Sequence, residues 1–197
     1  TKEELSEMMV GRKVSFSVEK EEAKVGEPVL KVRNLYVASN SHKKDAVKNV
    51  SFDVCAGEVV CIAGIDGNGQ TELVYGLTGL SKIKKGKLYL KDIDITNHNI
   101  KKRNRFGMSH IPEDRHKHGL VLDYTLENNL VLQKYWLPEF TKAGFIRKKN
   151  VRKYAEKLIE EYDVRSASGV VSVCRQMSGG NQQKAIIARE LDNNPDL

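Results

Sequence analysis

Apolar and polar residues alternate in two stretches of the first third of the chain. From Val29 to Leu35 and from Val50 to Val54, apolar side chains are interleaved with polar or charged ones. This pattern is typical of strands with one buried face. The polar stretch from Ser39 to Asp45 predicts the loop between them.

Three shorter runs predict further strands. The apolar run Glu58 to Ala63 predicts a short buried strand. Lys87 to Leu90 and Gly107 to Ile111 have the same character. The last of these runs directly into Pro112-Glu113-Asp114-Arg115.

Helical patterns occupy both ends and the later part of the chain. Thr1 to Gly11 predicts a short helix, followed by a polar, linker-like stretch as far as Pro28. Thr125 is placed to cap a helix from Leu126 to Trp136, and Ala185 to Leu191 predicts another helix. A third helix is predicted by apolar residues at steps of three and four, with lysines and glutamates on the other face: Val151, Tyr154, Ala155, Leu158, Ile159 and Tyr162. Such a stripe can be core or partner surface, and core is favoured.

The stretch from Gly64 to Thr71 has the frame of a phosphate-binding loop. It lies between the predicted strand 58–63 and an apolar helical pattern that opens at Thr71. Glycines let successive N–H groups converge on phosphate oxygens at a helix N-terminus. In such loops a lysine grips the outer phosphates and a Ser or Thr hydroxyl reaches magnesium. Here Gln70 stands in the lysine position, and the alternative is a plain glycine-rich turn.

A second predicted anion site begins at Met177. Ser178 can cap the free N–H groups of the following helix, and Gly179 and Gly180 let a ligand approach its backbone. A Ser-Gly-Gly helix cap is common by itself. The two motifs in this order in one chain are specific.

The chain resembles an ATP-binding cassette of an ABC transporter. Gly64 to Thr71 stands in the place of the Walker A loop, and Met177 to Lys184 in the place of the signature motif. The stretches Ser-Gly-Gly-Asn-Gln-Gln-Lys and Pro-Glu-Asp-Arg are similar to the second cassette of twin-cassette ATPases that import sugars or nucleosides in bacteria. The resemblance implies an α/β fold, with an antiparallel β part, an incomplete RecA-like core and a helical subdomain.

The resemblance also implies the site residues, with ATP and Mg²⁺ as cofactors. Tyr36 falls where the family stacks an aromatic ring on adenine, with packing as its plain alternative. Glu113 stands at the Q-loop position, in place of glutamine, and with Thr71 is the candidate magnesium ligand; a salt bridge with Arg115 is its alternative. The remaining candidates for ATP binding are Gly64, Asp66, Gly67, Asn68, Gly69, Gln70, Thr71 and Glu72. The signature candidates are Ser178, Gly179, Gly180, Asn181 and Gln182.

The family's Walker B strand, catalytic glutamate and switch histidine have no counterpart in this sequence. We therefore expect a piece of a longer protein, inactive alone, with no catalytic residue of its own. Expected boundaries are a linker at 1–28 and a partial nucleotide-binding domain at 29–197. Within the domain we expect a β part at 29–57, a core at 58–122, a helical subdomain at 123–176 and the signature helix at 177–197.

Composition limits the partners. The chain has 33 Lys and Arg against 26 Asp and Glu, and only 7% aromatic residues, so its basic runs lack stacking platforms for nucleic acid. The sequence has no apolar run of about 18 residues, so no membrane span is predicted. The family resemblance, rather than composition, implies a peripheral protein at the cytoplasmic face of the bacterial plasma membrane, whose partners are the first cassette, permease subunits and, indirectly, a substrate-binding protein.

Several alternatives stay open. Solvation is the simplest explanation of the basic runs. The three cysteines predict buried reduced thiols, and His116 and His118 predict surface residues rather than metal ligands. The rival functions are a nucleotide-binding or structural cassette half without turnover, and a soluble ABC protein acting on nucleic acid.

Overall fold

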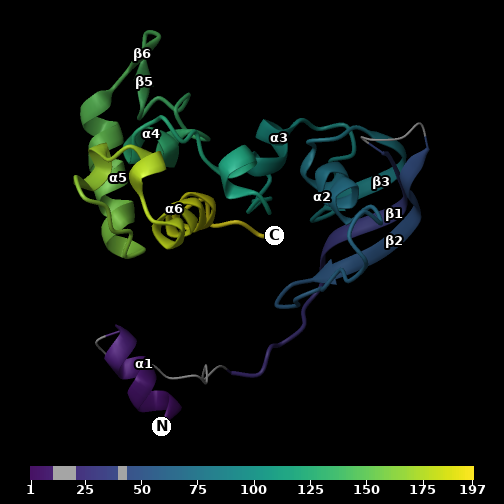
Figure 1. Cartoon of the computed structure of the whole chain (residues 1–197). Helices are drawn as coiled ribbons and strands as arrows, with labels where there is room; N and C mark the ends of the chain where they lie inside the picture. The colour runs from purple at the N-terminus through teal and green to yellow at the C-terminus, as the bar shows by residue number, and fades with distance from the viewer. Residues whose placement is uncertain (11–20, 40–43) are drawn as a thin grey trace.

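A computed structural model describes residues 1–10, 21–39 and 44–197. Its first elements are α1 (Lys2–Val10), β1 (Pro28–Ala38), β2 (Asp45–Cys55), α2 (Gln70–Thr78), β3 (Ile83–Leu90), β4 (Ile93–Asp94) and α3 (Ile100–Arg105). They are followed by the π-helical turn η1 (Arg115–Gly119), α4 (Leu126–Val131), β5 (Thr141–Lys142), β6 (Phe145–Ile146), α5 (Lys148–Glu161), the short 3₁₀ turns η2 (Gly169–Val171) and η3 (Cys174–Gln176), and α6 (Gly179–Leu191). Figure 1 shows the larger sheet with α2 against it, and α4, α5 and α6 gathered at the other side of the molecule.

The larger sheet is antiparallel and has the strand order β2-β1-β3-β4. In β1 the buried positions are Leu30 and Val32, then Leu35 and Val37. The register shifts between Val32 and Leu35, where Asn34 takes a φ of 49°. This extra residue acts as a bulge and returns the next apolar side chains to the core face. The predicted strands 29–35, 50–54 and 87–90 are confirmed within β1, β2 and β3.

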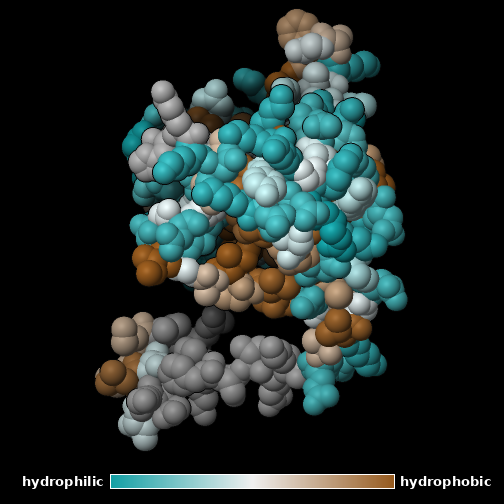
Figure 2. All heavy atoms as spheres, turned by 90° about the vertical axis from the view of Figure 1, so that its right-hand side faces the viewer, coloured by the Kyte–Doolittle hydropathy of each residue, from teal (hydrophilic) through white to brown (hydrophobic). Residues whose placement is uncertain are grey.

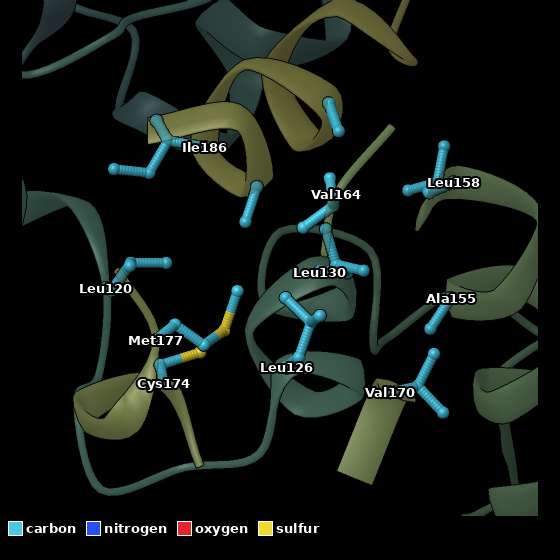
Figure 3. Close-up of a cluster of buried hydrophobic side chains, with 12 residues drawn as sticks. Leu120, Leu126, Leu130, Ala155, Leu158, Val164, Val170, Cys174, Met177 and Ile186 are labelled. Carbon is cyan, nitrogen blue, oxygen red and sulfur yellow. The ribbon is translucent and has the colours of Figure 1, made fainter. Parts of the chain in front are cut away.

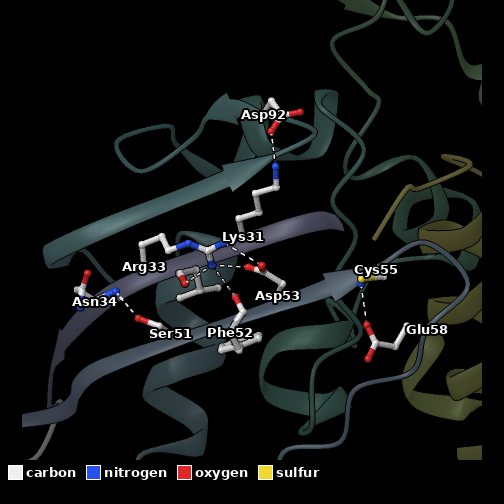
Figure 4. Close-up of polar contacts among 10 residues, drawn as sticks. Lys31, Arg33, Asn34, Ser51, Phe52, Asp53, Cys55, Glu58 and Asp92 are labelled. Atoms are coloured by element: carbon white, nitrogen blue, oxygen red, sulfur yellow. Dashed lines mark hydrogen bonds and ion pairs between the residues drawn. The ribbon is translucent and has the colours of Figure 1, made fainter. Parts of the chain in front are cut away.

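The outer face of this sheet carries polar contacts between neighbouring strands (Figure 4). Lys31 Nζ donates to Asp92 at 2.6 Å, and Arg33 Nη2 donates to Asp53 at 2.8 Å. Viewed from the sheet side, the surface is largely hydrophilic, with hydrophobic side chains gathered towards one edge (Figure 2). The sheet therefore buries one face and leaves the other to water.

Helix α2 packs closely on the buried face of the sheet. A Cβ atom on Gly76 would lie only 2.7 Å from Val37 Cγ2, so the helix can approach the strand because this residue has no side chain. The helix ends at Gly79, whose φ is 88° and whose N–H donates to Tyr75 O. Such a left-handed glycine is a common helix stop.

Arg103 connects α3 to the C-terminal end of α2. Arg103 is 2% exposed, and its guanidinium donates to the backbone oxygens of Gly76 at 2.7 Å and Thr96 at 3.0 Å, and also to Leu77 O. Burial lowers the pKa of this guanidinium. The basic run at 101–105 is thus not simply solvated, because one of its members holds the helix that follows the phosphate loop.

The later helices form a second core (Figure 3). Leu126 and Leu130 of α4 and Ala155 and Leu158 of α5 are each at most 1% exposed. Ala185, Ile186 and Ala188 of α6 join them. The predicted helix 151–162 is confirmed as α5, which ends at Glu161 with Tyr162 as its C-cap, and its apolar stripe packs in or against the core.

Asn129 is the polar centre of this second core. It is 1% exposed, and its Oδ1 accepts from Val121 N at 2.8 Å. Its Nδ2 donates to Val121 O at 3.0 Å and to Thr125 O at 3.1 Å. One buried amide therefore holds the loop that leads into α4.

Two predicted strands are wrong. Residues 58–63 are irregular, with Val59 95% exposed, because no described strand pairs with them and a strand needs a neighbour for its backbone hydrogen bonds. Residues 107–111 are also irregular. Ser109 N nevertheless donates to Leu197 O at 2.9 Å and Leu197 N to Gly107 O at 3.1 Å, the bond pattern of a parallel pair.

Smaller differences concern α4, the cysteines and the linker. Helix α4 ends at Val131, short of the predicted Trp136, and Thr125 precedes it without a side-chain cap bond. Cys174 is buried, but Cys61 is exposed because the predicted strand around it does not form. The predicted helix near the N-terminus is confirmed as α1, whereas the linker and the loop 39–45 lie partly outside the described residues. In the described ranges, no helix is long and apolar enough to cross a membrane.

Candidate nucleotide site

The predicted phosphate loop forms a tight turn that ends at the start of α2. Gly67 and Gly69 have φ values of 83° and 98°, a region that strongly favours glycine. Asn68 N donates to Ile65 O at 3.2 Å within the turn, and Leu73 N donates to Gly69 O at 2.8 Å as the helix begins. No side chain caps this helix. The first N–H groups of α2 therefore meet the loop, as phosphate binding requires.

Gln70 folds back onto the loop. Its Nε2 donates to Ile65 O at 3.1 Å. A Cβ atom on Gly64 would lie 2.1 Å from that same nitrogen, so the amide covers the glycine. The position where a lysine would carry a charge towards phosphates holds a neutral amide bonded to its own loop.

A cavity runs along the loop and is closed on the other side by the start of β2. Its walls are Asp66 to Glu72 on one side and Ser39 with Lys44, Asp45 and Ala46 on the other. Of the predicted ATP-binding residues, all but Tyr36 and Gly64 line it. Tyr36 is half-buried on β1, with Lys85 Nζ 5.8 Å from its ring centre.

A second cavity places Thr71 and Glu113 together. It lies between α2 and residues 110–118 and is also lined by Gln70 and His110. Burial, together with His118, lowers the pKa of His110. A hydroxyl and a carboxylate are oxygen donors of the kind Mg²⁺ prefers, and this ion usually takes few protein ligands beside phosphate and water. The two candidate ligands therefore fit the ion in chemistry.

The stretch Pro112 to Gly119 turns at Asp114. Its carboxylate accepts from His116 N at 2.9 Å and from Lys117 N at 3.0 Å. These N–H donors lower the pKa of Asp114. The predicted surface placement of His116 and His118 is confirmed, since both are exposed.

The predicted signature motif forms the start of α6. Ser178 Oγ accepts from Asn181 N at 3.5 Å and from Asn181 Nδ2 at 3.0 Å. Ser178 and Gly180 are exposed, and a Cβ on Gly180 would meet nothing within 4 Å. The predicted serine cap is confirmed. This helix start is open to a partner.

Gln182 points the other way. It is 4% exposed, donates through Nε2 to Cys174 O at 2.8 Å, and its Oε1 lies 2.9 Å from His116 Nε2. Because that oxygen can only accept, His116 carries a proton on Nε2. The buried side chain joins η1 to α6 instead of facing a ligand.

Sequence reasoning missed two groups at the site. His116 and Arg115 pack η1 against the first turn of α6, where a Cβ on Gly179 would lie 2.9 Å from Arg115 Nη2. Lys44 lines the cavity along the phosphate loop. The Pro-Glu-Asp-Arg stretch at 112–115 is the sequence signal for the packing of η1 on α6. No sequence signal pointed to Lys44.

Together the folded loop, the serine-capped helix and the two subdomains define a nucleotide-binding cassette of the α/β class. Comparisons with known proteins agree. The family model described as ABC transporter matches residues 47–197. The chain therefore belongs to the ABC transporter family.

The similar curated proteins are import ATP-binding proteins. The chain is 49% identical over its whole length to the nucleoside import ATP-binding protein NupA of Lactococcus lactis, and 46% identical over 99% of its length to the guanosine import ATP-binding protein NupO of Bacillus subtilis. It is 35% identical over its whole length to the ribose import ATP-binding protein RbsA of Clostridium tetani. The chain spans 38% of the length of the first two relatives and 37% of the third.

Solved structures agree on the fold. An ATP-binding cassette of an ABC transporter in its ADP conformation matches with a TM-score of 0.64 at 23% identity, over 86% of this chain and 66% of that one. A dimeric cassette bound to ADP and Pi matches with a TM-score of 0.65 at 23% identity, over 84% of this chain and 70% of that one. The predicted cassette fold is confirmed.

Proposed function

We propose that this chain belongs to the ATP-binding subunit of an importer for nucleosides or simple sugars. It forms the second of two cassettes, with residues 1–28 as the linker and 29–197 as part of the nucleotide-binding domain. The similarity to nucleoside, guanosine and ribose import ATP-binding proteins supports this class of cargo. Permease subunits at the cytoplasmic face of the membrane are the expected partners, and no nucleic acid is expected.

Two paired cassettes form two nucleotide sites, each built from the phosphate loop of one cassette and the signature helix of the other. This cassette contributes unequally to the two sites. One observation carries the proposal: the loop position for lysine holds a neutral, self-bonded Gln70, while the signature helix is capped by an exposed Ser178. In paired cassettes, each signature helix covers the nucleotide on the other phosphate loop. This chain therefore completes the site of its partner and weakens its own.

Within its own site the chain can still bind Mg-ATP. The N–H groups at the start of α2 would hold phosphate oxygens, and Thr71 with Glu113 would hold the magnesium ion, which neutralises phosphate charge. Loss of the lysine removes a charge-assisted contact of about 1.5–3 kcal/mol. Binding would survive at lower affinity, and stabilisation of the transition state would suffer more.

A bulky cation at the signature serine tests the proposal. In the full-length protein assembled with its permease, Ser178→Arg should abolish ATPase activity and transport, since the side chain would fill the open helix start. The matched control is Ser168→Arg, which places the same group on another exposed serine of the helical subdomain. Unchanged turnover in the Ser178 variant would overturn the proposal.

The rival function is a cassette pair that binds nucleotide without turnover. The self-bonded Gln70 favours it for this site, because no lysine charge is present to stabilise a transferring phosphoryl group. ATP-dependent association of the intact pair with no phosphate release would support this rival.

A further inference from the structure

The cavity along the phosphate loop has two walls that approach each other closely. A Cβ atom on Gly69 would lie 2.9 Å from Ala46 O, so the first residues of β2 pack directly on the loop. Lys44 and Asp45 precede Ala46 and line the same cavity. Lys44, directly before β2, therefore lines the same cavity as the loop that would hold phosphates.

The charges of this cavity are unbalanced. Asp45, Asp66 and Glu72 bring carboxylates to it, and Lys44 is the one cation among its described lining residues. Asp45 is already paired with Lys84. A polyphosphate entering here would meet uncompensated acidic side chains, and Gln70 offers no charge because its amide is bonded to Ile65 O.

Lys44 is available to such a ligand. Its side chain is exposed and makes no hydrogen bond or ion pair with any residue that the structure describes. Lysine carries a compact charge with three donors on a flexible stem, which suits contact with a phosphate from outside the loop.

We propose that Lys44 supplies, from the opposite wall of the cavity, the positive charge that the phosphate loop lacks at Gln70. The proposal rests on the proposed function, since it requires ATP on this loop. In this arrangement the positive charge comes from Lys44, directly before β2, instead of from a lysine at position 70 at the start of α2. Its ligand is the polyphosphate chain of a nucleotide.

A double-mutant cycle tests this relocation. Lys44→Ala, Gln70→Lys and the double variant are made in the full-length protein. Binding is followed by cross-linking of azido-ATP with Mg²⁺, quantified on the peptide that contains Tyr36, so that a second nucleotide site does not contribute. Lys44→Ala should weaken labelling about tenfold or more, as expected for a lost charge-assisted hydrogen bond. Gln70→Lys should restore it in the double variant, and Lys44→Arg should retain it.

Lys48→Ala is the matched control. Lys48 is exposed on β2, four residues after Lys44, but does not line the cavity, so the variant removes the same charge elsewhere. Equal loss in both alanine variants would mean a long-range charge effect and would overturn the proposal. Unchanged labelling in Lys44→Ala beside a labelled wild type would overturn it as well. Absence of labelling in the wild type and in Gln70→Lys would remove the proposed nucleotide site itself, and the inference with it.

Discussion

The phosphate loop with α2 and the signature motif with α6 are two glycine-rich helix starts that differ in almost every physical respect. Exposed apolar residues lie before and within the phosphate loop, with Val59 95% and Ile65 79% exposed, and its helix begins at an uncapped left-handed glycine. The second begins at a serine cap, and its helix buries Ala185, Ile186 and Ala188 in a core shared with α4 and α5.

The two regions differ in whether the segments that pack against them are present among the described residues. The core around α6 is completed by α4, α5 and η3, all within residues 120–191. A helix also satisfies its own backbone. The segment before the phosphate loop was predicted as a buried strand, and a strand is stable only beside another. Among the described residues no strand pairs with it, and Val59 and Ile62 are exposed.

The largest expected difference between the two regions appears when one apolar side chain is truncated in each. Leu130→Ala should lower the free energy of unfolding by about 2–5 kcal/mol, because Leu130 is 1% exposed in the helical core. Val59→Ala should change it by less than about 0.5 kcal/mol. Urea unfolding monitored by circular dichroism measures both. A large cost at Val59 would show that the segment 58–63 is packed in solution and would break the comparison.

Next in size is the backbone of the phosphate loop. Gly69→Ala should cost about 1–3 kcal/mol, since its φ is 98° and its new Cβ would lie 2.9 Å from Ala46 O. Gly180→Ala at the start of α6 is the control, because nothing lies within 4 Å of its Cβ position. Its unfolding midpoint should stay close to the wild type. Similar losses at both glycines would contradict the strain assigned to Gly69.

The serine cap of α6 should contribute less. Ser178→Ala should lower stability by about 1 kcal/mol through loss of the bond from Asn181 N. Ser178→Asp should retain most of the stability, because aspartate also caps. If alanine costs nothing, Asn181 alone closes this helix start.

The smallest effect is a pH dependence at the far side of α6. Lys184 and then Arg165 lower the pKa of Asp163 to about 2, below its ordinary value of about 3.9. The folded state thus prefers the carboxylate, and its contribution is present above about pH 4 and lost as pH falls towards 2. The stability difference between wild type and Asp163→Asn should therefore shrink between pH 5 and pH 3. In a Lys184→Met background, the dependence should weaken.

Much of the fold could be predicted from local pattern. Alternation predicts β1 and β2, a short apolar run predicts β3, and three- and four-residue spacing predicts the buried face of α5. The predicted strands at 58–63 and 107–111, which rest on short apolar runs, are wrong. Periodicity shows which apolar side chains lie on one face of an element. It does not detect whether a neighbouring strand is present.

The candidate site divides in the same way. The loop glycines, Thr71 and the Ser178 cap follow from residue type and spacing, because φ preferences and helix capping act over a few residues. The inward orientation of the Gln182 side chain could not be predicted, since its hydrogen-bond partners His116 and Cys174 lie 66 and 8 residues away. The same holds for Lys44, which lines the cavity beside the loop because Ala46 of β2 packs on Gly69.

The sequence by itself determined the family, the order of the two motifs and the absence of a lysine at position 70, because these are properties of residue type at fixed spacing. The tertiary structure decided where the Gln70 amide binds, that Gln182 turns inward, and that Lys44 lines the cavity beside the loop. Those outcomes depend on contacts between segments distant in the chain, where packing and hydrogen bonding choose among orientations that the local sequence leaves open.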